Sequence, residues 1–159
     1  MRSILPSEIE EGEERAAGFV LFRTLNHQRQ YLLLHHQRSC HWAFPKGRLE
    51  PGEAEIEAAI RETFEETSIS NLAPVLGFRE TSSYTVSRNG QPRSKIVAYF
   101  LAETTQSEVA LSTEHKAFQW MAFPEAIELL TYDESRRILT DADYLLTALA
   151  DGREQDDPQ

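Results

Sequence analysis

Residues 47–69 read Gly-Arg-Leu-Glu-Pro-Gly-Glu-Ala-Glu-Ile-Glu-Ala-Ala-Ile-Arg-Glu-Thr-Phe-Glu-Glu-Thr-Ser-Ile and carry the most regular pattern in the chain. The first six residues hold two glycines and a proline, which predicts a turn leading into a helix over 54–67. Small and apolar residues recur there at i, i+3, i+4, i+7 and i+8, so we expect this helix face to pack on a sheet. These residues are Ile56, Ala59, Ile60, Thr63 and Phe64.

A second arc of the same helix is acidic. Glu62, Glu65 and Glu66 follow the spacing i, i+3, i+4, so their carboxylates project towards a common region. One interpretation is a solvated surface face, in which Arg61 forms an ordinary i, i+4 pair with Glu65. The other is a cation site, because clustered carboxylate oxygens suit Mg²⁺ or Mn²⁺.

The spacing around the helix resembles the Nudix signature. That signature places a glycine, a glutamate, an Arg-Glu pair and a Glu-Glu pair at fixed intervals, and ends on an aliphatic residue. Gly47, Glu53, Arg61, Glu62, Glu65, Glu66 and Ile69 occupy these positions. Two positions depart from it: Thr63 replaces an aliphatic residue, and Ser68 replaces a glycine after the helix. If that last position requires a positive φ, Ser68 is strained there.

The resemblance implies roles for the charged residues of the signature. Glu62, Glu65 and Glu66 would bind the metal, with the Gly47 carbonyl as a further ligand. Arg61 would orient the carboxylates, and Glu53 would support the loop and the outer metal shell. The implied cofactor is Mg²⁺ (or Mn²⁺), which would offset phosphate charge and activate a water for attack on phosphorus.

Segments on both sides of the signature resemble the asymmetrical diadenosine tetraphosphate hydrolases of animal and archaeal type. They are 41–53, 95–103 and 111–120, and the similarity spans about 17–149. By this resemblance Glu114 is a metal ligand or general base, and its alternative role is a cap. His41, Lys46 and Lys95 would contact the phosphate chain, although a lysine that opens a strand is usually a solvated flank. Tyr84 and Tyr132 would sandwich an adenine, or are simply half-buried.

The segment 85–94 looks longer than in that subfamily. Arg88 and Arg93 lie within it and would add phosphate contacts, or the extra length would displace Tyr84. The other histidines (His27, His35, His36 and His115) are interpreted as structural or surface residues. Cys40 is the only cysteine, so an internal disulfide is excluded, and nothing beside it argues for a nucleophile.

The rest of the chain predicts an α/β Nudix fold, a mixed β-sheet sandwiched between helices. We expect strands at 16–24, 31–36, 95–103 and 117–122, and helices at 124–130 and 135–150. An extended segment over 75–86 is expected to break near Ser82-Ser83, and 88–92 is expected to turn. Residues 1–14 are interpreted as an acidic flexible arm, 15–150 as the Nudix domain and 151–159 as a disordered acidic tail.

The 159 residues carry a formal net charge of −10. This charge argues against long nucleic acid and anionic membrane as partners. The resemblance implies a small dinucleoside polyphosphate as the substrate. His41, Lys46, Arg48 and Lys95 would then form a local basic rim around the metal site. No signal peptide or membrane span is evident, and we expect a cytoplasmic monomer.

Three hypotheses for function follow. The first is metal-dependent hydrolysis of a phosphoanhydride, with diadenosine tetraphosphate cut to ATP and AMP. The second keeps the chemistry and changes the substrate to an RNA 5′ end, a diphosphoinositol polyphosphate or a nucleotide sugar. The third is a non-catalytic Nudix-fold nucleotide-binding module, which would usually lack some of the signature carboxylates.

Overall fold

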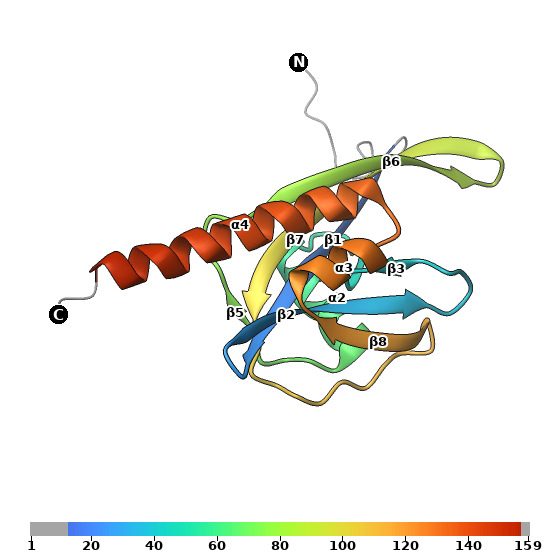
Figure 1. The fold of residues 1–159 in the computed structure, drawn as a ribbon. Coiled ribbons are helices and arrows are strands. Elements are labelled where there is room, and N and C mark those ends of the chain that lie inside the picture. The colour runs from blue at the N-terminus through green and yellow to red at the C-terminus, as the bar shows by residue number, and fades with distance from the viewer. Residues whose placement is uncertain (1–12, 157–159) are drawn as a thin grey trace, which may run out of the picture.

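The computed structural model describes residues 13–156, which form one mixed sheet with helices on both of its faces (Figure 1). The strands are β1 (Glu13–Leu25), β2 (Gln28–His36), β3 (Trp42–Ala43), β4 (Lys46–Arg48), β5 (Ala73–Pro74), β6 (Glu80–Arg88), β7 (Gln91–Glu103) and β8 (His115–Met121). The helices are α2 (Glu55–Thr67), α3 (Phe123–Leu129) and α4 (Asp133–Asp156). The strand order is β3–β2–β1–β7–β5, while β4 pairs with β1, β6 with β7 and β8 with β2. The central pair β1 and β7 is parallel, and the remaining pairs are antiparallel.

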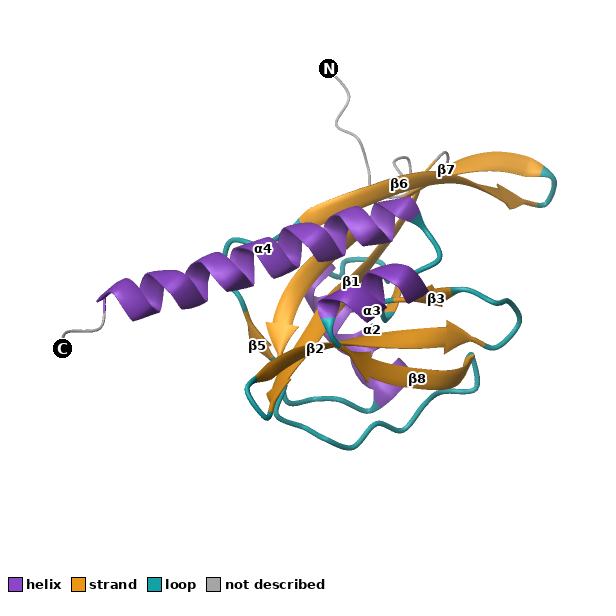
Figure 2. Cartoon of the chain, in the orientation of Figure 1, coloured by secondary structure: helices purple, strands orange, loops and turns teal. Residues whose placement is uncertain are grey.

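Strand β1 explains the layered arrangement, because its side chains alternate between the two faces. Phe19 and Leu21 join the core under α2, whereas Val20 and Phe22 join the core under α3 and α4. All four side chains are buried. Figure 2 shows α3 and α4 in front of the sheet and α2 behind it, so the expected α/β sandwich is confirmed.

Most predicted elements lie where the sequence indicates. The strands over 16–24 and 31–36 pair as an antiparallel hairpin, with Phe22 opposite Tyr31. Helix α2 begins at Glu55, directly after its N-cap Ala54. Pro124 stands in the first turn of α3, where its missing N–H costs nothing.

Three boundaries were predicted wrongly. The chain is irregular over 75–79, and β6 runs without interruption through Ser82-Ser83 because the whole strand pairs with β7. The expected arm ends too late, since Glu13 and Glu14 already belong to β1; residues 1–12 lie outside the described residues. The expected tail starts too early, since α4 continues through Asp156.

The buried face of α2 agrees with the prediction at Ala59 and Thr63, which are fully buried, and differs from it at two positions. Ile60 and Phe64 are 44% and 53% exposed. The buried positions are mostly small and include one carboxylate: Ala58, Ala59, Thr63, Glu66 and Thr67. Small side chains let the helix approach the sheet closely, and the helix is turned so that one edge of its acidic arc faces inward.

The helix ends at Ser68, whose backbone has φ +64° and ψ +14°. The position therefore requires the left-handed conformation that glycine adopts at least cost, as the signature suggested. The Ser68 N–H bonds to the carbonyl of Phe64 at 2.8 Å, which closes the helix terminus.

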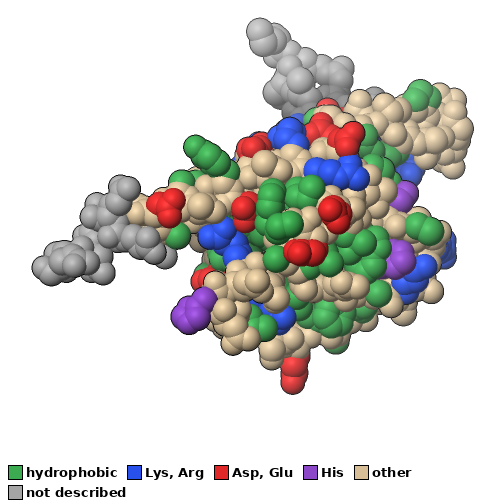
Figure 3. Space-filling model, viewed as in Figure 1, with side chains coloured by type: hydrophobic (Ala, Val, Ile, Leu, Met, Phe, Trp, Pro, Cys, Tyr) green, Lys and Arg blue, Asp and Glu red, His purple; other side chains and the backbone are tan. Residues whose placement is uncertain are grey.

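Over residues 13–156, no helix combines the length and apolar character that crossing a membrane requires. On the face that carries α3 and α4, basic and acidic side chains are interspersed over α4 (Figure 3).

Candidate active site

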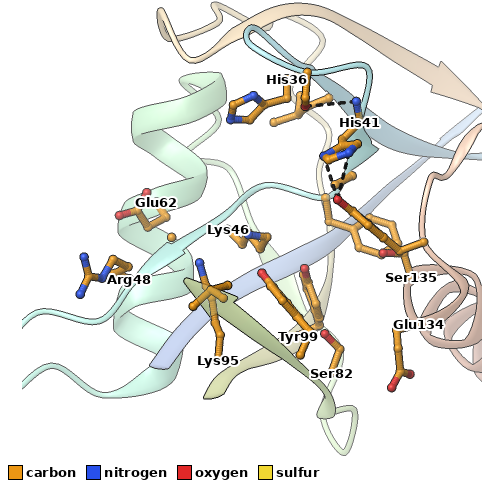
Figure 4. A pocket seen from close by; sticks show the side chains of 18 of the residues that line it. His36, His41, Lys46, Arg48, Glu62, Ser82, Lys95, Tyr99, Glu134 and Ser135 are labelled. Atoms are coloured by element: carbon orange, nitrogen blue, oxygen red, sulfur yellow. Dashed lines mark hydrogen bonds between the residues drawn. The ribbon is translucent and has the colours of Figure 1, made fainter. Parts of the chain in front are cut away.

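A cavity of about 1010 Å³ opens where β4, α2, the β6–β7 hairpin and the start of α4 meet. Figure 4 shows Glu62 and Arg48 at one end, Lys46 and Lys95 in the middle, and Tyr99, Ser82 and Ser135 towards the other end. The predicted site residues that line the cavity are His41, Lys46, Gly47, Glu62, Glu66, Tyr84, Lys95, Glu114 and Tyr132. Residues that are far apart in sequence, from β4 to the loop before β8, therefore share one hollow.

Arg61 connects the signature glutamates to the turn before the helix. Its guanidinium donates from Nε and Nη2 to both oxygens of Glu53, at 2.8 and 2.9 Å. Its Nη1 donates to Glu62 at 2.8 Å and to Glu65 at 3.2 Å. Nη2 also donates to the Arg48 carbonyl at 2.9 Å. A planar fork with several donors makes such contacts at once, so this geometry supports an orienting role for Arg61.

Glu53 completes this network. Its Oε1 accepts from the Glu50 backbone N–H at 2.9 Å, which ties the turn to the helix through Arg61. The hydrogen bonds from Arg61, and then that from Glu50, lower the pKa of Glu53 to about 2. Glu53 does not line the cavity, and its contacts fit the expected support of the loop.

Gly47 lies directly against Glu62. A Cβ added at Gly47 would stand 1.9 Å from Cδ of Glu62, closer than any real contact. The glycine is therefore required by the close approach of β4 to α2, which places its backbone beside the carboxylate.

Glu66 is the most buried carboxylate of the signature, at 5% exposed. It accepts a hydrogen bond from the Lys46 backbone N–H at 3.0 Å. Burial raises the pKa of Glu66 to about 8, and the charges of Glu62 and Glu114 act in the same direction. Burial likewise raises the pKa of Glu62, against the hydrogen bond from Arg61.

Ligand atoms of Glu66, Glu114 and His115 all lie within 4.8 Å of one another. A buried carboxylate beside a second carboxylate and an imidazole is stabilised by a cation, so these residues fit a divalent metal ion. His115 was predicted to be a structural or surface residue, and the structure brings its ring into this group. The sequence could have suggested His115 as a site residue only because it directly follows Glu114, a predicted metal ligand. His36 packs edge-on against it, with ring centroids 5.8 Å apart.

Glu65 lies apart from this group. Its side chain is 53% exposed, contacts Arg61 and does not line the cavity. Of the three signature glutamates, Glu62 and Glu66 alone face the hollow.

The predicted basic residues line the cavity. Arg48 and Lys46 come from β4, and Lys95 stands opposite Tyr84 in the β6–β7 ladder. Burial, and then the charge of Lys46, lower the pKa of Lys95 to about 8. Polyanion binding would offset this crowding of positive charge.

Tyr84 and Tyr132 both line the cavity and are 42% and 48% exposed. Tyr84 lies opposite Lys95 in the β6–β7 ladder, and the pairing continues beyond them to a turn at Asn89-Gly90. The Tyr132 hydroxyl contacts Nδ1 of His41 at 2.8 Å, with the two rings edge-on.

Arg88 is paired within the protein. It donates to both carboxylate oxygens of Glu14, at 2.6 and 3.0 Å. This pair fastens the β6–β7 hairpin to the beginning of β1, and sequence analysis gave no sign of it.

Comparisons with known proteins agree with this geometry. The NUDIX domain family matches residues 13–142. The pig (Sus scrofa) bis(5′-nucleosyl)-tetraphosphatase [asymmetrical] is 34% identical over 147 residues, covering 86% of this chain and 97% of the relative. The Caenorhabditis elegans protein of the same name is 37% identical, covering 79% and 91%. A crystal structure of a C. elegans Ap4A hydrolase binary complex superposes with a TM-score of 0.77 at 36% identity, covering 85% of this chain and 98% of that one. The chain belongs to the Nudix family.

Proposed function

We propose that this Nudix protein hydrolyses diadenosine tetraphosphate asymmetrically, adding one water to give ATP and AMP. The observation that carries the proposal is one cavity that joins the buried carboxylate of Glu66 and the carboxylates of Glu62 and Glu114 to basic residues and two exposed tyrosines. Similarity to relatives named for this activity supports it, because it extends over most of both chains.

The proposed metal is Mg²⁺ or Mn²⁺, held by Glu62, Glu66, Glu114 and His115. Glu65 and the Gly47 carbonyl, which the family resemblance suggested, are further candidates. When bound, a divalent cation offsets charge on the phosphates and activates water for attack. Arg61 keeps the Glu62 carboxylate aligned through its 2.8 Å hydrogen bond.

The basic residues would bind the polyphosphate. Figure 4 shows Lys46 and Lys95 between Glu62 and Tyr99, with Arg48 near Glu62, so a phosphate chain would pass along these basic residues. His41 would contact the same chain after releasing the Tyr132 hydroxyl. Tyr84 and Tyr132 would stack on an adenine ring, since a purine packs well on an aromatic face.

Product analysis tests the proposed reaction. The purified full chain is incubated with MgCl₂ and diadenosine tetraphosphate, and the nucleotides are separated by ion exchange. We expect ATP and AMP in equal amounts, and a loss of at least about 100-fold in Glu66→Gln, which removes a buried charge at the cation site. ADP as the sole product, or no product while a nucleotide sugar or a diphosphoinositol polyphosphate is cleaved, would refute the asymmetrical assignment.

Metal binding tests the proposed cation site directly. Free Mn²⁺ is followed by electron paramagnetic resonance as protein is added. We expect His115→Ala to weaken binding about tenfold, the loss typical of removing one contact at a metal centre. His27→Asn, in the exposed β1–β2 turn, should bind like the wild type. Equal affinity in His115→Ala would remove His115 from the site.

A further inference from the structure

Three hydroxyl groups at one end of the cavity form no hydrogen bond with any other part of residues 13–156. They belong to Ser82 on β6, Tyr99 on β7 and Ser135 in the first turn of α4. These residues are 6%, 3% and 7% exposed, yet all three line the cavity. Figure 4 shows them on the side away from Glu62 and Arg48.

Buried polar groups in proteins are nearly always hydrogen-bonded, so three unpaired hydroxyls in one place require an explanation. Within the described residues, the fully enclosed side-chain atoms without a partner belong instead to Glu13, His35, Thr63 and Trp120. The hydroxyls of Ser82, Tyr99 and Ser135 are not sealed in this way. Each oxygen therefore keeps accessible surface, and a molecule in the cavity can reach it.

The surroundings of these hydroxyls are aromatic. Phe44 packs edge-on against Tyr99, with ring centroids 5.4 Å apart, and both line the cavity. Tyr84 and Tyr132 add two exposed rings to the same hollow. Aromatic walls with polar groups at the end suit a flat heterocycle that carries hydrogen-bonding atoms on its edge.

We propose that Ser82, Tyr99 and Ser135 bind the polar edge of the substrate's purine ring. A hydroxyl both donates and accepts, so these groups can serve the acceptor nitrogens of the ring and the donor amino group of adenine. Stacking on tyrosine tolerates any base, because every base has an aromatic face. The hydroxyls thus supply the contacts that distinguish the base, and Lys46 and Lys95 lie between them and Glu62, where the phosphates would run.

This inference rests on the proposed function in one respect, that the bound ring belongs to a nucleotide substrate. It is tested by binding without catalysis. Three ligands that contain no phosphoanhydride are titrated into the ¹⁵N-labelled full chain in MgCl₂: AMP, purine riboside 5′-monophosphate, which lacks the amino group, and ribose 5-phosphate, which lacks the base. Dissociation constants are read from amide chemical shifts.

Wild-type protein should bind AMP more tightly than the other two ligands. Ser82→Ala, Tyr99→Phe and Ser135→Ala should each raise the Kd for AMP about fivefold, the effect of one net hydrogen bond. Their Kd for ribose 5-phosphate should stay unchanged. The matched control is Ser87→Ala, which removes an exposed hydroxyl of β6 outside the cavity and should bind all ligands like the wild type.

Two results would overturn the inference: an unchanged Kd for AMP in all three variants, or an equal rise for AMP and ribose 5-phosphate. Failure of the proposed function is seen separately, as absence of ATP and AMP from diadenosine tetraphosphate. If the chain binds AMP through the hydroxyls and does not hydrolyse diadenosine tetraphosphate, the inferred base site stands and the proposed reaction is refuted.

Discussion

The buried carboxylate of Glu66 should destabilise the protein when metal is withheld, so Glu66→Gln should stabilise the metal-free fold while removing activity. Glu66 is 5% exposed and accepts one backbone hydrogen bond, from Lys46. Glutamine keeps an oxygen that can accept this hydrogen bond and carries no charge. The substitution therefore removes the cost of burying a carboxylate and little else.

The magnitude follows from the pKa of Glu66, which burial raises from 4.5 to about 8. Below pH 4.5 the carboxyl is protonated in both the folded and the unfolded chain, and the free energy of unfolding is unaffected. Between pH 4.5 and 8 the unfolded chain releases this proton and the folded chain keeps it. Each pH unit then lowers the free energy of unfolding by about 1.4 kcal/mol, to at most about 5 kcal/mol above pH 8.

Urea denaturation in EDTA measures the difference. We expect Glu66→Gln to exceed the wild type by about 3 kcal/mol at pH 8, because local rearrangement relieves part of the full cost, and by under about 1 kcal/mol at pH 5. Glu65→Gln is the matched control on the same helix; its side chain is 53% exposed, and the change should stay within about 0.5 kcal/mol at both pH values. A gain of equal size at pH 5 and pH 8, or a loss at pH 8, would refute the reasoning.

Three further substitutions test other parts of the structure. Arg61→Lys should lower kcat/KM by about 100-fold with circular dichroism unchanged, because lysine cannot reproduce the bidentate contact with Glu53; a fall below threefold would contradict this. Ser68→Gly should raise the free energy of unfolding by about 0.5 kcal/mol by relieving the left-handed backbone, and a lower melting temperature would count against it. Arg88→Gln should lower the free energy of unfolding at pH 7, because it removes the close partner of the buried Glu14 carboxylate and leaves the longer contact with Arg48 at 3.9 Å. Since Arg88 lowers the pKa of Glu14, its stabilising effect is present above pH 4.5 and lost as the pH falls, so the deficit should shrink at pH 3.5.

Much of the fold could be predicted from periodicity, because strands and helices bury side chains at different intervals. The alternation in β1 and the spacing in α4 depend on local sequence alone, and both elements were found. The face of α2 was misjudged at Ile60 and Phe64, because residue spacing does not fix how far the helix is rotated about its axis on the sheet. Ala58 and Thr67 are buried against the sheet instead, and their small size permits close packing.

Contacts of the candidate site could be predicted between residues that are close in sequence. Contacts between residues that are far apart in sequence could not be predicted. Arg61 and Glu53 lie eight positions apart and meet through a turn and a helix whose geometry the spacing fixes. Glu14 and Arg88 are 74 positions apart, and their pairing depends on the parallel alignment of β1 with β7. His115 joins Glu66 only because the loop before β8 folds back over α2, which no local pattern records.

The contact between Gly47 and Glu62 constrains how related sequences diverge. A side chain at position 47 would overlap the Glu62 carboxylate where it now stands, so position 47 is restricted to glycine for as long as that carboxylate keeps its place. Replacement of Glu62 by a small residue would free that space, and a larger residue could then replace Gly47. A homologue with a bulky residue at the position of Gly47 should therefore also lack the Glu62 carboxylate, and with it the proposed metal-dependent hydrolysis.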